Sequence, residues 1–122
     1  MKKRNYKGKI EETKRILNSF RSSYPKGCIK ISKTESKEHA RVKTEVGLFL
    51  LKNDYKIWSE ATFKHPYKGR CDLIAVHPSG ISYCFEIVCT EKEKSLLKKA
   101  KNYPTDIIVV DVKDFKFEDF EL

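Results

Sequence analysis

Apolar residues recur at helical spacing between residues 36 and 53, which predicts an amphipathic helix there. The apolar members of one helix face lie at i, i+4, i+7 and i+8: Val42, Val46, Phe49 and Leu50. At about 100° per residue, the same stripe continues toward the N-terminus through polar side chains: Glu35, His39 and Lys43. Burying such groups is costly unless they have partners. We therefore expect this end of the helix to face a wet or charged site, or else to rise out of the core into solvent.

A hairpin is predicted from two β-rich runs that flank a turn containing proline and glycine. The runs span residues 70–77 and 81–89, on either side of residues 78–80. In the register that such a three-residue loop favours, Asp72 lies directly opposite Glu86, and both project from one sheet face. Two carboxylates in this otherwise apolar patch destabilise the sheet unless a divalent cation compensates their charge. The alternative is a register shifted by one residue, with one carboxylate in solvent.

The remaining apolar patterns predict an α/β fold. A capping box formed by Thr90 and Glu93 opens a helix over about residues 91–102, before a buried strand at 106–112. Weaker patterns predict a helix at 9–20, strands at 28–32 and 55–63, and a phenylalanine-rich edge at 114–122. Strand–helix–strand units form right-handed parallel crossovers. We expect a central mixed four-stranded sheet flanked by helices and covered on both faces.

Charge is unevenly distributed along the chain. The 122 residues carry 26 Lys and Arg against 17 Asp and Glu, a formal net charge of +9. Residues 1–34 hold 11 basic and two acidic residues, whereas residues 35–122 are balanced. This pattern indicates a basic N-terminal extension, residues 1–34, and a polyanionic partner, either nucleic acid or an anionic membrane surface. We expect a group of basic residues to bind the phosphate backbone of the partner: Lys2, Lys3, Arg4, Lys7, Lys9, Lys14, Arg15 and Arg21.

Several classes of protein are disfavoured by what the sequence lacks. The longest apolar run, Gly47–Leu51, is far shorter than a membrane span, and no apolar segment follows the basic N-terminus. The four cysteines include one C-x4-C spacing without a second pair, so buried thiols are favoured over a zinc site. We therefore expect a cytoplasmic protein that does not bind a membrane.

The order of these elements resembles the core of the PD-(D/E)XK nuclease superfamily. The segment from Gly69 to Leu73 matches the family's P-D element, and Glu86-Ile87-Val88 matches its E-x-K element. The preceding helix, with its E-S-x-x-H-x-x-x-K pattern over residues 35–43, is similar to CoiA-like competence nuclease domains. The resemblance implies a restriction-endonuclease-like domain at residues 35–122. It also implies that Asp72 and Glu86 hold Mg²⁺ (or Mn²⁺), from which a bound water attacks a phosphodiester.

The resemblance has one departure, because the family's lysine falls on Val88. One interpretation is that Lys43 supplies the missing charge from the helix, with His39 as a proton carrier and Glu35 or Glu60 positioning the water. The alternative is a catalytically inactive nuclease fold that only binds nucleic acid. A third class is a protein-interaction module whose basic arm docks an acidic partner. The resemblance favours DNA over RNA, and by analogy with small nucleases it leaves a homodimer open.

Overall fold

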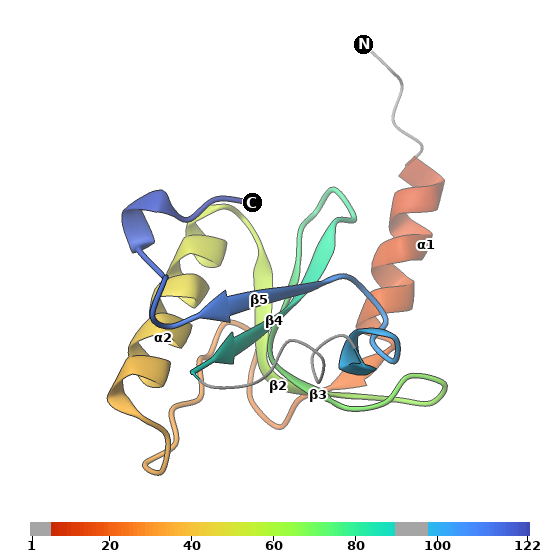
Figure 1. The fold of residues 1–122 in the computed structure, drawn as a ribbon. Coiled ribbons are helices and arrows are strands. Elements are labelled where there is room, and N and C mark those ends of the chain that lie inside the picture. Colours follow the sequence, from red (N-terminus) through yellow and green to blue (C-terminus); the bar gives the residue numbers. More distant parts are fainter. Residues whose placement is uncertain (1–5, 90–97) are drawn as a thin grey trace.

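A mixed five-stranded sheet forms the centre of the computed structural model, which describes the backbone of residues 6–89 and 98–122 and the side chains of residues 10–89 and 98–122 (Figure 1). The strands lie in sequence order: β1 (Phe20–Arg21), β2 (Lys56–Phe63), β3 (Arg70–Val76), β4 (Ser82–Val88) and β5 (Ile107–Asp111). Neighbours from β1 to β4 are antiparallel, and β5 runs parallel to β4. The α/β class and the mixed sheet are thus confirmed, but the predicted number of four strands is wrong.

The additional strand, β1, comes from the segment that the charge pattern assigned to an extension. It pairs with the end of β2, where Phe20 lies opposite Phe63. It follows helix α1 (Tyr6–Leu17), in which Ile16 is fully buried. Residues 16–21 therefore belong to the same sheet and core as the remainder of the chain. A two-residue strand is too short for its period to show in the sequence.

Helix α2 (Lys37–Lys52) lies one residue inside each predicted boundary. Ser36 is its N-cap, and the hydroxyl accepts a hydrogen bond from His39 N at 3.0 Å. Asn53 forms the C-cap. The buried side of α2 is the predicted stripe, and it includes Lys43 as well as its apolar neighbours. Burial of the stripe therefore extends into its polar half.

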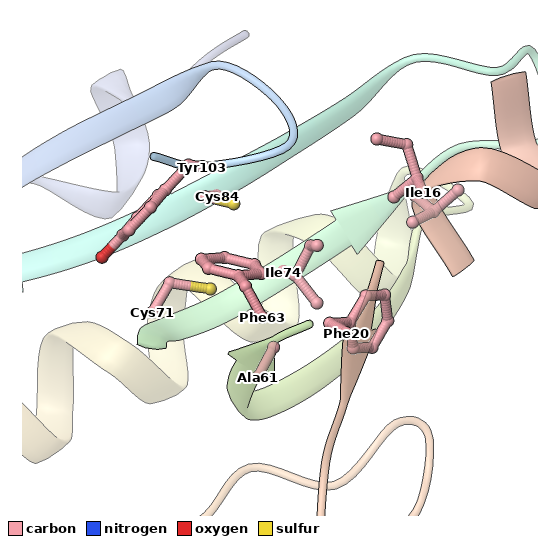
Figure 2. Packing of buried hydrophobic residues seen from close by; sticks show 9 residues of the cluster. Ile16, Phe20, Ala61, Phe63, Cys71, Ile74, Cys84 and Tyr103 are labelled. Carbon is pink, nitrogen blue, oxygen red and sulfur yellow. The ribbon is translucent and has the colours of Figure 1, made fainter. Parts of the chain in front are cut away.

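Each face of the sheet carries its own hydrophobic cluster, and Figure 1 shows α1 and α2 on opposite sides. One cluster joins α1, β1 and Tyr103 to the sheet, as Figure 2 shows. The other packs α2 and the C-terminal segment against the opposite face, where Phe49 and Phe120 have ring centroids 4.8 Å apart. That segment contains the short 3-10 helix η1 (Phe117–Asp119) rather than an edge strand.

Two further predicted segments differ from the structure. Residues 28–32 form no strand, and two of their backbone groups bond to a side chain instead: Ser59 Oγ donates to Cys28 O at 2.8 Å and accepts from Lys30 N at 3.0 Å. Residues 98–100 are helical. The capping box of Thr90 and Glu93 and most of the predicted helix at 91–102 lie outside the described residues.

The predicted register of the β3–β4 hairpin is confirmed. His77 N donates to Ile81 O at 2.8 Å, and the ladder runs from Val76–Ser82 to Leu73–Phe85. The next pair in this register is Asp72 and Glu86, where the ladder ends. The hairpin therefore brings these two acids to one end of the β3–β4 ladder.

Side-chain alternation is interrupted in β3 at Asp72. Leu73 contributes to the cluster beneath α2, but Cys71, two residues earlier, contributes to the cluster on the opposite face. In the β2–β3 register the residue opposite Asp72 is Glu60, which has a positive φ of 49° and is omitted from the ladder. Positive φ is uncommon outside glycine and re-aims the side chain. The sheet is thus irregular at the position of the predicted catalytic aspartate.

Candidate active site

Polar side chains at the N-terminal end of α2 form a connected cluster. Glu35 Oε1 accepts hydrogen bonds from Ser32 N at 2.6 Å and from Lys43 Nζ at 3.1 Å, while Glu35 Oε2 lies 2.5 Å from His39 Nδ1. Burial alone would raise the pKa of the Glu35 carboxyl, but these three hydrogen bonds outweigh it and lower the pKa. Glu35 is therefore held as a carboxylate, and it fixes the positions of His39 and Lys43.

His39 connects this helix to the sheet. Its Nε2 lies 2.9 Å from Ile87 O and 3.7 Å from Asp72 Oδ2. A carbonyl oxygen and a carboxylate can only accept, so each ring nitrogen of His39 lies beside an acceptor. His39 thus links Glu35 to the edge of β4, beside Asp72.

Asp72 receives a backbone hydrogen bond from the neighbouring strand, with Ile87 N 2.8 Å from Asp72 Oδ2. Burial raises the pKa of the Asp72 carboxyl, although the Ile87 hydrogen bond and the charges of His39 and Lys43 oppose this. The side chain remains 27% exposed. Asp72 is therefore a partly exposed carboxyl group in an environment that disfavours its ionised form.

Glu86 is 7% exposed, and its Oε1 lies 2.6 Å from the hydroxyl of Tyr103. The same hydroxyl lies 2.8 Å from Arg70 O, so one phenolic proton is shared between two acceptors. Burial and the contact with Glu86 raise the pKa of Tyr103. The Tyr103 ring packs against Gly69, where φ is +102° and an added Cβ would lie 3.1 Å from the ring. Glycine at position 69 therefore lets Tyr103 reach both partners.

Tyr103 was not among the predicted site residues. A signal was present in the spacing Lys99-x-x-x-Tyr103, which faintly resembles a Q-x-x-x-Y element found in some PD-(D/E)XK nucleases. The sequence could not predict the role of the Ser32 amide, which orients Glu35, because nearly every residue type supplies a backbone N–H.

Of the remaining predicted site residues, Glu60 bonds outside this cluster, whereas Lys43 belongs to it. The Glu60 carboxylate is 3.6 Å from Lys30 Nζ, and Val88 is buried at the position of the family's lysine. Lys43 is 3% exposed and bonds to Glu35. In residues 10–89 and 98–122, no group of three or more His, Cys, Asp or Glu side chains is placed to hold a metal ion.

The predicted phosphate-contacting residues of the N-terminal segment divide into three groups. Lys2, Lys3 and Arg4, together with the side chains of Lys7 and Lys9, lie outside the described part of the chain. Lys14 and Arg21 are exposed. Arg15 has a structural role, because it bonds to Glu12, to the hydroxyl of Tyr67 at 2.8 Å and to Pro104 O at 3.0 Å. Arg15 thus fastens α1 to two loops of the sheet.

Comparisons of the chain with models of protein families, with curated proteins and with solved structures find no match. Within the described residues, no helix has the length and apolar character needed to cross a membrane. Interpretation of the site therefore depends on its own geometry.

Proposed function

We propose that this chain is a metal-dependent nuclease with a restriction-endonuclease-like core, which hydrolyses phosphodiester bonds in DNA. The observation that carries the proposal is the meeting of α2, β3 and β4 at one end of the sheet. There His39 bridges Glu35 on one side and Ile87 O and Asp72 on the other, and Ile87 follows Glu86 in β4. This ionic cluster is assembled from three elements and is half-buried, with some of its side chains exposed to solvent. Such clusters are typical of catalytic sites.

The order of elements supports the same proposal. A helix packed on one face, three antiparallel strands and a fourth strand parallel to the third follow one another from α2 to β5. This is the order that the resemblance to the PD-(D/E)XK superfamily implies. In that arrangement Asp72 lies near the start of the second core strand and Glu86 lies in the third.

The donor atoms at this place fit a magnesium ion. Two carboxylates and a backbone carbonyl are the hard oxygen ligands that Mg²⁺ prefers. The raised pKa of Asp72 fits as well, because a bound cation would offset the penalty on its negative charge. Asp72 and Glu86, with the Ile87 carbonyl, would hold the ion. When bound, such an ion lowers the pKa of a coordinated water and polarises the phosphate.

The residues of α2 provide the charge that Val88 does not. Lys43 places a positive charge near Asp72, His39 lies 3.7 Å from the Asp72 carboxylate, and Glu35 holds both side chains in position. These side chains are pre-organised, because each is fixed by hydrogen bonds before substrate binds. Lys43 would stabilise negative charge on the phosphate, and the His39 Nε2 proton would be available to an oxygen at the site.

A cleavage assay with end-labelled single-stranded and duplex DNA, in Mg²⁺, Mn²⁺ or EDTA, tests the proposal. We expect the wild type to cut in either metal and not in EDTA. Asp72→Asn should bind DNA but cut at least about 100-fold more slowly. Asp119→Asn, which removes the same charge from the exposed helix η1, should cut as the wild type does. Equal cleavage by wild type and Asp72→Asn would reject the site, and DNA binding without any cleavage would favour the inactive fold.

A further inference from the structure

The loop that connects β2 to β3 is strongly basic and leads directly into the candidate active site. It contains no acidic residue between Glu60 and Asp72. Three cations in this interval, all on exposed residues, are Lys64, Lys68 and Arg70. Figure 1 shows this hairpin loop projecting beyond the body of the sheet. It is thus a local positive surface in a part of the chain that is balanced in charge overall.

The loop is held in place by hydrogen bonds from the surrounding structure. Lys64 N donates to Ser19 O at 2.8 Å, and Lys68 N donates to Asn102 O at 2.9 Å. Arg15 Nη1 donates to the Tyr67 hydroxyl at 2.8 Å. These bonds fix the loop to α1 and to the segment before β5. Its cations are therefore presented on a rigid support, which lowers the entropic cost of binding.

The segment bound to this loop extends the same positive surface. Lys98 and Lys101 are exposed and precede Asn102, the acceptor for Lys68 N. The following residue, Tyr103, connects Arg70 O to Glu86. A positive surface thus continues from the loop to a residue that contacts a predicted metal ligand.

These cations have no carboxylate partner among the residues that the structure describes. Within residues 10–89 and 98–122, no ion pair involves the five that form this surface: Lys64, Lys68, Arg70, Lys98 and Lys101. In contrast, Lys30, Arg41 and Lys43 are each paired with a glutamate. Cations that lack an acidic partner in the protein are available to phosphates.

We propose that the β2–β3 loop, with Lys64, Lys68 and Arg70, is the surface that binds the phosphate backbone of DNA next to the scissile bond. This inference rests on the proposed function. It deepens that function by assigning the main contact with the DNA backbone to this loop rather than to the N-terminal segment. The Cα atom of Lys68 is at most about 14 Å from that of Asp72 along the chain. One DNA strand advances about 3.4 Å per phosphate, so the loop would contact phosphates within about four nucleotides of the cut.

A salt titration of DNA binding tests the proposal, with all proteins in EDTA so that no cleavage occurs. The test variant is Lys64→Gln/Lys68→Gln. The matched control is Lys52→Gln/Lys56→Gln, which removes the same charge from exposed residues at the end of α2 and the start of β2. Each lost phosphate contact should reduce the slope of log K against log salt by about 0.9. We expect a slope reduced by about 1.8 and binding about 60-fold weaker at 0.1 M salt for the loop variant alone.

The outcomes separate this inference from the function on which it rests. Equal slopes for the loop variant and its control would overturn the role of the loop, even if the wild type cleaves DNA. If the wild type binds DNA with the predicted difference but never cleaves, the loop is supported and the nuclease proposal is rejected. No binding of DNA at low salt, or binding only of an RNA duplex of the same sequence, would overturn both.

Discussion

Substitution of Lys43 tests both the stability of the protein and the proposed chemistry of the site. Its side chain is 4% exposed and its ammonium bonds to Glu35, whose side chain is 12% exposed. Removing one partner of a buried ion pair typically costs about 3–5 kcal/mol. Glu35 keeps the Ser32 amide and His39 as donors, so we expect the lower end of this range for Lys43→Met. Methionine retains most of the aliphatic stem and leaves little cavity.

The expected loss of about 3 kcal/mol corresponds to a large change in melting temperature. A chain of 122 residues has an unfolding entropy of about 0.26 kcal/mol/K at about 2.1 cal/mol/K per residue. The melting temperature should therefore fall by about 12 °C, and urea unfolding should give the same free-energy difference. Under the proposed function, cleavage of DNA should fall by about 100-fold or more, because Lys43 would stabilise negative charge on the phosphate.

The double variant Glu35→Gln/Lys43→Met separates the two roles. Replacing both members of a buried pair is often neutral or stabilising. We therefore expect the double variant to recover most of the stability that Lys43→Met loses, but not the cleavage activity. A loss below about 1 kcal/mol in the single variant, well under the cost of an unpaired buried charge, would refute this account of the pair. So would a double variant that is as unstable as the single one.

Three further predictions follow from the other carboxylates and from Tyr103. Asp72→Asn should unfold at a higher urea concentration than the wild type at pH 7, because the raised pKa means that folding disfavours the carboxylate; a less stable variant would contradict this. The pKa of Glu35 is lowered on folding, so its contribution is present above the unfolded value near 4.5 and is lost as the pH falls through the folded pKa. Glu35→Gln should therefore flatten the acid limb of the stability curve measured by urea unfolding between pH 2 and 6, and an unchanged limb would contradict the assignment. Tyr103→Phe should reduce kcat with little change in DNA affinity, because the hydroxyl donates to Glu86, a proposed metal ligand; an effect confined to affinity would contradict this.

The parts of the site that were predictable from the sequence are those set by regular geometry. The α2 stripe follows from a period of 3.6 residues, and Lys43 and His39 lie on it as expected. The hairpin register follows from loop length, which placed Asp72 and Glu86 at one end of the β3–β4 ladder. Both features depend on spacing alone, which the sequence contains directly.

The parts that were not predictable depend on irregular backbone or on long-range contacts. The period-two rule did not predict the positive φ of Glu60 or the interrupted alternation at Asp72. Nor did it predict the separate partners of the two carboxylates: Asp72 contacts Ile87 N and His39, and Glu86 contacts Tyr103. The fifth strand also escaped prediction, because only its pairing with β2 makes residues 20–21 a strand.

The central claim is that Asp72 and Glu86 together hold a divalent cation, and titration with Mn²⁺ followed by calorimetry tests it most directly. We expect about one ion per chain in the wild type, since both acids are proposed to hold the same ion. Binding should be lost in Asp72→Asn and in Glu86→Gln. It should be retained in Asp119→Asn and Glu118→Gln, which remove the same charges from η1. Equal Mn²⁺ binding by all five proteins would contradict the claim.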